Sequence, residues 1–451
     1  MVPDFGNISR RHLLGTITGL AVPVVLANIA QTLMGLVDTL MVGRLGHTPL
    51  AAVGVATLLF SAVAMTIKAV DTAAQTFTAQ RVGAGREGEV GSVLATALTT
   101  VLVVGALFMT VGLSWPEFQM RWVATDPEVR RLGAEYLVWR YAGILPFLVF
   151  FIFRAVFDGI GWTRIGMVVG IGMNLANAFL NWVLIFGKFG LPALGVPGAA
   201  MASSISSALA ALVIVSVALR PSVRKRYCLL SRHNLQPRLL VPFLRIAWPP
   251  AVQSLAVIVA FLVFFAILGL ISTVAVAAGN VVMRIAALSF MPGFGVGVAV
   301  QTLVAQALGR QDWKGAVRVG WGGVGLAMAF MGVFGLLFLA IPATLMRIFT
   351  SSQELVAAGT PVLRLMGLVQ LIDAVGITLA SALRGAGATR TVMLVDLFAG
   401  FLLLPSCSYL FGVVLGGGLL GAFVAVLLWF SLYAAGMTFW FLRGDWRTIK
   451  I

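Results

Sequence analysis

The sequence is poor in charge, and above all poor in acidic side chains. Only 10% of its 451 residues are charged, and 15 Asp and Glu stand against 31 Lys and Arg. Hydrophobic residues, in contrast, make up 60% of the chain. A soluble domain cannot bury so much apolar surface, so the composition predicts an integral membrane protein. Apolar runs of about 20 residues without strict alternation favour membrane helices over a β-barrel.

Motifs for ATP hydrolysis and for metal binding are missing as well. No G-x(4)-G-K-[ST] run occurs, so we expect no ATP-driven process. The three histidines and two cysteines lack the spacing of metal ligands, so the sequence predicts no cofactor and no transition-metal site. Cys228 and Cys407 lie in a basic stretch and in an apolar run, and we expect them to be unpaired. Conventional catalysis is therefore not expected, and neither is a nucleic-acid partner.

Apolar stretches between polar breaks predict a polytopic all-α membrane protein with twelve transmembrane helices. Most of the Lys and Arg residues lie in alternate connections, which is the pattern of loops retained in the cytoplasm. We therefore expect a multi-pass protein of the cell inner membrane, surrounded by the lipid bilayer, with both termini in the cytoplasm. The predicted spans are 14–42, 50–80, 92–113, 131–156, 164–187, 196–219, 241–271, 276–307, 316–342, 358–383, 391–413 and 418–442.

The two halves of the chain repeat each other at one constant offset of 226 residues, the difference between Pro23 and Pro249. Each half holds six spans, an even number, which predicts two bundles related by a pseudo-two-fold axis along the membrane normal. We expect an N-terminal lobe of 1–220, a basic cytoplasmic linker of 221–245 and a C-terminal lobe of 246–451. The other matching pairs are Gln75 and Gln301, Thr76 and Thr302, Ala79 and Ala305, Gln80 and Gln306, Gly83 and Gly309, Gly159 and Gly385, Gly161 and Gly387, Thr163 and Thr389, and Arg164 and Arg390.

Asp38 in the first predicted span is the leading candidate for a functional site. A carboxylate inside a bilayer costs roughly 2.5–3.5 kcal/mol, so it is a candidate functional residue by default. Gln31 lies seven residues earlier, two helical turns along the same face. A carboxylate suits H⁺ and Na⁺, because both ions bind negatively charged oxygen. As an alternative to a functional role, the Asp38 carboxylate pairs with a neighbouring hydroxyl group or with Arg44.

Asp373 in the tenth span is the best acidic candidate in the second half. It precedes Arg384 by eleven residues, which places it near the middle of the bilayer. Asp373 either binds a coupling ion or substrate, or forms a hydrogen bond that packs two helices together. Under the repeat, Asp38 aligns with Phe264 and Asp373 with Phe147, so neither acid is duplicated.

Three further charged residues are secondary candidates. Lys68 and Asp71 lie three residues apart, close enough to pair on one helix face, and a local salt bridge is the favoured interpretation. Asp396 follows Arg390 by six residues, which predicts a position near the cytoplasmic edge, and its role is open.

Asparagines form a stripe in the fifth span. Asn174, Asn177 and Asn181 recur at three- and four-residue steps on one helix face. They either line a polar cavity beside Asp38 or hold neighbouring helices together. Ser203 in the sixth span is a hydroxyl partner for either arrangement.

Over essentially its full length, the sequence resembles the multidrug and toxic compound extrusion (MATE) family. The resemblance depends on P-x(7)-Q-x(6)-D at Pro23, Gln31 and Asp38, followed by VGRLG-x(3)-LAA. The A-Q-x-x-G ends of spans two and eight, the G-x-G-x-T-R loops at 159–164 and 385–390, and the GVPGAA segment before span six fit it as well. It implies an exporter of organic cations or drugs that exchanges them for H⁺ or Na⁺ by rocking two lobes.

The sequence departs from family patterns at positions that bear on the ion. Many relatives place an acid where this chain has Asn181, and sodium-linked relatives carry a glutamate in span seven, where residues 243–271 contain no acid. Asp373 keeps the aspartate of span ten. The coupling ion therefore stays open between H⁺ and Na⁺, with Na⁺ at Asp373 or Asp38 as one possibility.

The sequence-based prediction is thus a monomeric multidrug antiporter that works by alternating access. A rival within transporters is a lipid-linked saccharide flippase of the same superfamily, although the intramembrane acids argue against its more cationic groove. A membrane-embedded lipid-modifying enzyme is a rival from another class. It would need acids and histidines clustered at an interfacial loop, and the sequence shows no such cluster.

Overall fold

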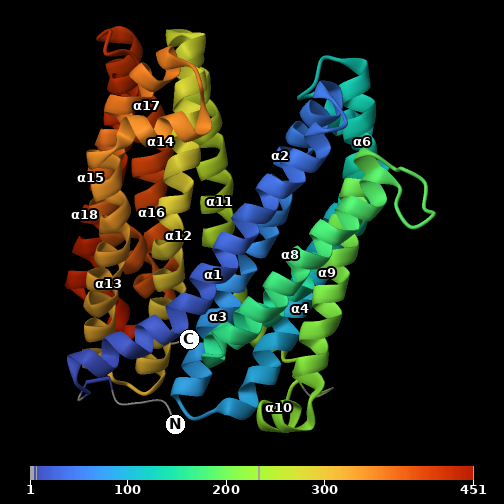
Figure 1. Ribbon diagram of the computed structural model, residues 1–451. Coiled ribbons are helices and arrows are strands. Elements are labelled where there is room, and N and C mark those ends of the chain that lie inside the picture. Colours follow the sequence, from blue (N-terminus) through green and yellow to red (C-terminus); the bar gives the residue numbers. More distant parts are fainter. Residues whose placement is uncertain (1–4, 7, 232–233, 450–451) are drawn as a thin grey trace. The chain divides into compact units, whose positions relative to one another are not determined.

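The computed structural model describes residues 5–6, 8–231 and 234–449, and every regular element in them is helical (Figure 1). In these residues, eleven helices are long and apolar enough to cross a membrane. A twelfth span is formed by α6 (Pro127–Ala142) and α7 (Ile144–Ile160) together, which meet at a bend of 47°. Each predicted span coincides with one of these helices or with this pair. The predicted all-α, twelve-helix membrane fold is confirmed.

The chain packs as two compact units. One, here called the N-terminal unit, is Leu26–Ala251. Its helices, besides α6 and α7, are α2 (His47–Lys68), α3 (Val70–Gly83), the short η1 (Glu87–Glu89), α4 (Val90–Ser114), α5 (Pro116–Arg121), α8 (Thr163–Phe186), α9 (Val196–Leu219) and α10 (Pro221–Arg226).

The other, here called the C-terminal unit, is Met1–Val25 with Val252–Ile451. Its helices are α12 (Thr273–Gly309), α13 (Trp313–Ala340), α14 (Pro342–Phe349), α15 (Gln353–Gly385), α16 (Thr389–Asp396), α17 (Leu404–Tyr409), α18 (Gly418–Arg443) and the short η5 (Asp445–Thr448). Two π-helical stretches, η3 (Leu397–Leu403) and η4 (Leu410–Val414), interrupt the span that begins with α16.

Two helices run from one unit into the other. Helix α1 (Arg10–Gly43) passes between units after Val25, and α11 (Pro237–Ile271) passes after Ala251. These two points are 226 residues apart (251 − 25), which is the offset of the sequence repeat. The packing units are thus a different division of the chain from the predicted lobes of 1–220 and 246–451, which stay a prediction based on the repeat.

The same close contact occurs in both units at repeat-related positions. A Cβ atom on Gly159 would lie 2.6 Å from the backbone oxygen of Gln75, and one on Gly385 would overlap the backbone oxygen of Gln301. In each unit a helix with glycine at this point therefore touches the backbone of a neighbouring helix. Glycine is required there because any larger residue would force the helices apart.

The segment before α1 is fastened to the C-terminal unit by Arg318. The Phe5 side chain is fully buried, and the Arg318 guanidinium donates to the backbone oxygens of Phe5 (3.0 Å), Gly6 and Ile8 (2.7 Å). Asp312 accepts a hydrogen bond from the Gly6 N–H at 3.0 Å. One cation thus satisfies three carbonyl groups of a segment that has no helix of its own.

Replacing Arg318 by glutamine should loosen this segment. Hydrogen bonds from charged groups contribute about 1.5–3 kcal/mol each, so we expect a lower Tm and faster limited proteolysis at the amino terminus. The matched control is Arg443→Gln, because the Arg443–Asp445 pair is exposed at both side chains and should contribute little. Equal effects of the two substitutions would contradict the assigned role of Arg318.

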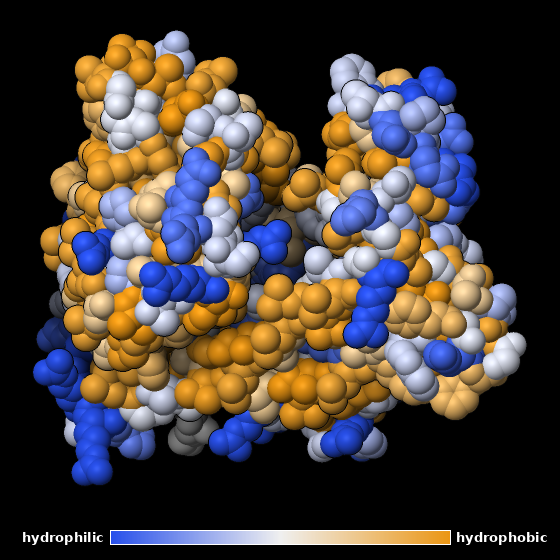
Figure 2. Space-filling view, turned by 45° about the horizontal axis from the view of Figure 1, so that its top comes forward, coloured by the Kyte–Doolittle hydropathy of each residue, from blue (hydrophilic) through white to orange (hydrophobic). Residues whose placement is uncertain are grey.

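The surface of the molecule carries extensive apolar areas. Figure 2 shows broad hydrophobic regions on the face in view, and large exposed side chains such as Leu40, Leu107 and Leu336 are more than half exposed. Patches of this extent are too large for a soluble monomer and fit contact with lipid chains.

Candidate functional site

Asp38 on α1 lies against α8, where it meets two of the predicted asparagines. The Asn181 amide nitrogen donates a hydrogen bond to Asp38 Oδ1. The Asn177 amide is oriented with its oxygen accepting from the Ser203 backbone N–H at 3.1 Å, so that its nitrogen donates to Asp38 Oδ1 at 3.1 Å. All four residues belong to the N-terminal unit. The structure thus brings Asp38, Asn177, Asn181 and Ser203 together.

This cluster is held by rigid helices rather than by loops. Asn177 and Asn181 lie one helical turn apart on α8, and α8 packs along α9, which carries Ser203. The hydroxyl groups of Ser206 and Ser207 both donate to the Ser203 backbone oxygen, at 3.0 and 2.8 Å. The Ser203 carbonyl group is therefore bound by two hydroxyl groups of the following turn of α9, while its N–H group orients Asn177.

The polar groups of the cluster suit a small cation. Both donors to Asp38 are neutral amides, which stabilise a carboxylate without cancelling its charge. Asn181 is 1% exposed, and its Oδ1 atom has no hydrogen-bond partner among the described residues. A buried oxygen left in this state is costly unless it meets a proton donor or a cation. H⁺ and Na⁺ both fit, since hard cations take oxygen ligands.

Arg140 on α6 is the positive charge that acts on Asp38. Its guanidinium lies 4.1 Å from the centre of the Phe60 ring, and no ion pair within 4.0 Å joins it to Asp38 in the described part of the chain. Asp38 is therefore not locked to Arg44 or to any other basic side chain. Its charge stays available to a mobile cation.

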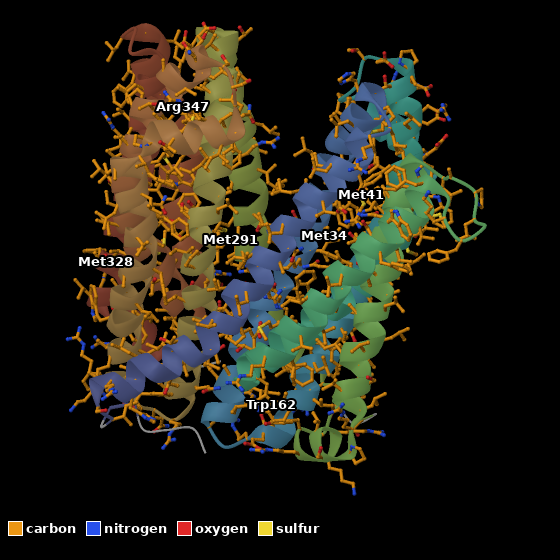
Figure 3. All side chains as sticks on the ribbon, viewed as in Figure 1. Met34, Met41, Trp162, Met291, Met328 and Arg347 are labelled. Atoms are coloured by element: carbon orange, nitrogen blue, oxygen red, sulfur yellow. The ribbon has the colours of Figure 1, made fainter. Side chains whose placement is uncertain are left out.

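Two residues that the sequence predicts for this site, Gln31 and Asn174, lie outside the cluster. Gln31 is exposed and makes no hydrogen bond within the described residues, and Asn174 is half-buried and makes none either. Met34 and Met41, labelled in Figure 3, lie on α1 on either side of Asp38 along the helix. The roles of Gln31 and Asn174 stay predictions.

A second polar cluster lies inside the C-terminal unit. Asp396 accepts hydrogen bonds from Gln253 Nε2 on α11 (2.7 Å to Oδ2) and from Trp429 Nε1 on α18 (3.2 Å to Oδ1). Asp373 on α15 is 5% exposed and makes no hydrogen bond or ion pair with any other described residue.

Lys68 and Asp71 form the local ion pair that their spacing predicts. Lys68 Nζ lies 2.8 Å from Asp71 Oδ2, and the pair bridges the break between α2 and α3 at Ala69. Lys68 ends α2 and Asp71 lies in the first turn of α3, so each charge also faces the favourable end of its helix dipole. This arrangement accounts for both charges without an ion.

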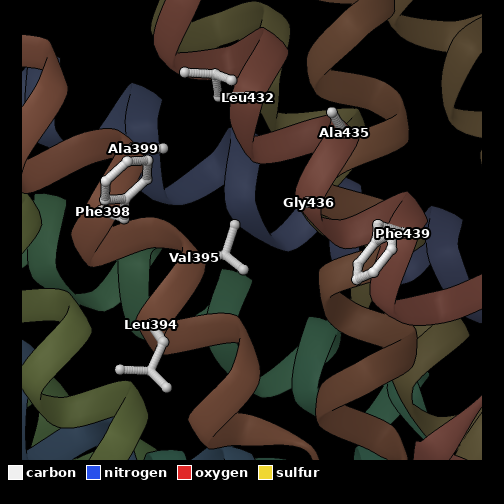
Figure 4. Close-up of a pocket in the computed structure, with 8 residues that line it drawn as sticks. All are labelled: Leu394, Val395, Phe398, Ala399, Leu432, Ala435, Gly436 and Phe439. Carbon is white, nitrogen blue, oxygen red and sulfur yellow. The ribbon is translucent and has the colours of Figure 1, made fainter. Parts of the chain in front are cut away.

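An apolar groove of about 490 Å³ lies between α16, η3 and α18 (Figure 4). Only hydrocarbon side chains line it, among them Phe398, Leu432 and Phe439. Asp396 follows the lining residue Val395 in the sequence but is not itself part of the lining, so the groove offers no group that selects a cation.

Arg140, Gln253 and Trp429 are the members of the two clusters that sequence reasoning missed. The sequence does not assign a partner to Arg140, and Gln253 lies in a span that contains no acid. A signal existed for Gln253, since it follows the Pro249–Pro250 pair within an otherwise apolar run. No local signal marks Trp429.

Curated relatives match the chain over most of its length. A probable multidrug resistance protein NorM of Thermotoga maritima is 28% identical over 440 residues, which cover 95% of this chain and 92% of the relative. The multidrug resistance protein NorM of Vibrio cholerae is 28% identical over 373 residues, covering 81% and 80%.

Solved structures share the fold. An outward-facing multidrug resistance MATE family transporter of the MOP superfamily matches with a TM-score of 0.90 at 20% identity, covering 97% of both chains. A MOP superfamily transporter from Pyrococcus furiosus, described as having a binding pocket of reverse polarity that suggests a different function, matches with a TM-score of 0.88 at 19% identity, covering 97% of both chains. These likenesses support the fold alone.

The MatE family model matches residues 23–183 and 249–410, two segments that begin at Pro23 and Pro249 and so reproduce the 226-residue repeat. The matched residues are more than half of the chain and include Asp38, Asn177, Asn181, Asp373 and Asp396. The chain belongs to the MatE family, the multidrug and toxic compound extrusion transporters.

Proposed function

We propose that this protein is a multidrug efflux antiporter that exports organic cations or amphipathic toxic compounds in exchange for H⁺ or Na⁺. The observation that carries the proposal is Asp38, a carboxylate that receives hydrogen bonds from neutral amides and has no basic partner within ion-pair distance in the described residues. The names of the curated relatives as multidrug resistance proteins support the substrate class.

Exchange follows from competition for one negative charge. An ionised Asp38 attracts a cationic compound, whereas an Asp38 that has taken up H⁺ or Na⁺ has lost that attraction. Loading from outside and release inside would then drive export in the opposite direction. Each inward positive charge gains roughly 2.3 kcal/mol per 100 mV of membrane potential.

Alternating access has a structural basis in the two helices that join the units. The chain passes between units only after Val25 and after Ala251, two residues beyond Pro23 and one beyond Pro250. Proline removes a backbone hydrogen bond, so bending of α1 and α11 is cheapest near these points. We propose that the units move about these two helices within the cell inner membrane, as a monomer with both termini in the cytoplasm.

Separate ion gradients test the function directly. The purified protein is placed in proteoliposomes loaded with a fluorescent organic cation, and a pH gradient or a Na⁺ gradient is imposed alone. We expect one of the two gradients to drive export, since the oxygen-lined cluster at Asp38 accepts either ion. Protein-free vesicles are the control, and transport driven by neither gradient would overturn the proposal.

A further inference from the structure

The connection between α9 and α11 concentrates positive charge. Seven of the 31 Lys and Arg residues fall within 220–245, and no Asp or Glu occurs anywhere between Asp158 and Asp312. Arg220 directly follows the last residue of α9, and Arg238 is the second residue of α11. Because both helices are long and apolar enough to cross a membrane, this charge lies where the two spans leave the bilayer.

The connection is folded onto the N-terminal unit. The backbone oxygen of Tyr227 accepts a hydrogen bond from the Gly91 N–H at 3.0 Å, and the buried Tyr227 ring meets the Trp162 ring edge-on, with 5.7 Å between the ring centres. The Arg226 guanidinium donates two hydrogen bonds to the Glu87 carboxylate, at 2.6 and 2.9 Å. Contacts with η1, with the start of α4 and with the residue before α8 thus fix α10 at one end of these helices (Figure 1).

Three basic side chains of this folded connection have no acidic partner. Arg220, Arg224 and Lys225 are exposed, and no ion pair within 4.0 Å joins any of them to an acid among the described residues. Glu87, the acid that lies against the connection, already pairs with Arg226. Arg220 and Arg224 lie four residues apart at the start of α10, a spacing at which like charges repel each other. A bound anion would offset this repulsion.

Apolar side chains are exposed beside these charges. Leu219 is 44% exposed, Leu230 38% and Leu235 65%. Leu230 has a φ of 55° and Cys228 a φ of 46°, left-handed values that are costly for residues with a side chain. A strained backbone that leaves a leucine exposed brings no benefit in water. Exposed leucines among arginines are typical of a surface that lies at the boundary between headgroups and acyl chains.

We propose that Arg220, Arg224 and Lys225 bind the phosphodiester headgroups of anionic phospholipids, while Leu230 and Leu235 contact the adjoining acyl chains. The charges are complementary, since guanidinium groups bind phosphate oxygens in a bidentate manner and clusters of basic residues beside a span attract anionic lipids. A soluble polyanion would meet the charges but not the exposed leucines. The site does not depend on the proposed antiport.

Lipid-dependent thermal unfolding of the purified full-length protein tests the site. The Tm is measured in a non-ionic detergent with increasing phosphatidylglycerol, with the same amounts of phosphatidylcholine, and with inorganic phosphate. We expect only phosphatidylglycerol to raise the Tm, because a ligand that binds the folded state stabilises it. The rise should shrink at high NaCl concentration, since salt screens exposed charges.

The triple variant Arg220→Gln/Arg224→Gln/Lys225→Gln should bind phosphatidylglycerol about a hundredfold more weakly, at about fivefold for each charge removed. Its Tm without lipid should remain close to wild type, because all three side chains are exposed. Leu235→Ser removes an apolar side chain that is 65% exposed, so it should weaken the lipid response several-fold and also leave the lipid-free Tm unchanged.

The matched control removes two arginines and one lysine that are exposed but isolated in the sequence. Each has no other Lys or Arg within eight residues on either side, so we expect the lipid response to be largely kept. The control variant is Arg121→Gln/Lys188→Gln/Arg347→Gln.

The proposal fails if the triple variant keeps the wild-type response to phosphatidylglycerol, or if the control variant loses as much of it. Equal stabilisation by phosphatidylcholine would show that charge is not recognised, and equal stabilisation by inorganic phosphate would assign the cluster to a soluble anion. Either result overturns the proposal. None of these outcomes bears on the antiport, which the gradient experiment tests by itself.

Discussion

Replacing Asp38 by asparagine should abolish ion-driven export while leaving the protein folded. The amide keeps the size of the side chain but removes the charge that a cation must meet, and loss of one partner of a buried charge pair costs about 2–5 kcal/mol. That corresponds to a fall of ~30-fold or more in binding. The measurement is gradient-driven efflux of a fluorescent organic cation from proteoliposomes.

The control for this substitution is Asp445→Asn, which makes the same chemical change at an exposed position. The Tm of both variants should remain close to wild type, because Asp38 takes part in no ion pair within the described residues. Wild-type efflux by the Asp38→Asn variant would remove this residue from the coupling mechanism.

Alanine at Gly159 or Gly385 should destabilise the protein strongly, and by similar amounts at the two positions. Each new methyl group would collide with a backbone oxygen, that of Gln75 or Gln301, and a backbone cannot rotate away as a side chain can. Overpacking of this kind typically costs 1–3 kcal/mol, so we expect a Tm lowered by several degrees (about 2–4 °C per kcal/mol).

Gly172→Ala on α8 and Gly325→Ala on α13 are the matched controls. A Cβ atom at either position meets nothing within 4 Å. Alanine is about 1 kcal/mol better than glycine inside a helix, so these variants should be neutral or slightly stabilising. Destabilisation at Gly385 with none at Gly159 would show that the repeat does not carry the same contact in both units.

Much of the architecture follows from the sequence alone, for a local reason. A membrane span must satisfy its own backbone hydrogen bonds and be apolar along its whole length, so each helix is visible in its own stretch of sequence. The fourth span is predicted from the sequence despite the bend between α6 and α7, because both parts are apolar. The repeat is also detected from the sequence, since matching residues such as Pro23 and Pro249 keep one constant offset.

The sequence predicts only some of the residues of the candidate sites. Asp38 is predicted because an acid in an apolar helix is rare, and its asparagine partners are predicted because they recur on one face of the fifth span. Gln31 lies on α1 at the expected spacing, yet it is exposed and makes no hydrogen bond to Asp38 in the described residues. Helical spacing places residues on a face, but the face that meets α8 is decided by how α1 is rotated in the packed unit.

Sequence by itself determined the membrane class, the number of spans, their bounds to within a few residues, the duplication and the two leading acidic candidates. Tertiary structure alone decided which residues meet them. Asn181 is 143 residues from Asp38, and Gln253 is 143 residues from Asp396. Such pairs depend on the depth and rotation of several helices at once, and these are set by the packing of every neighbouring side chain.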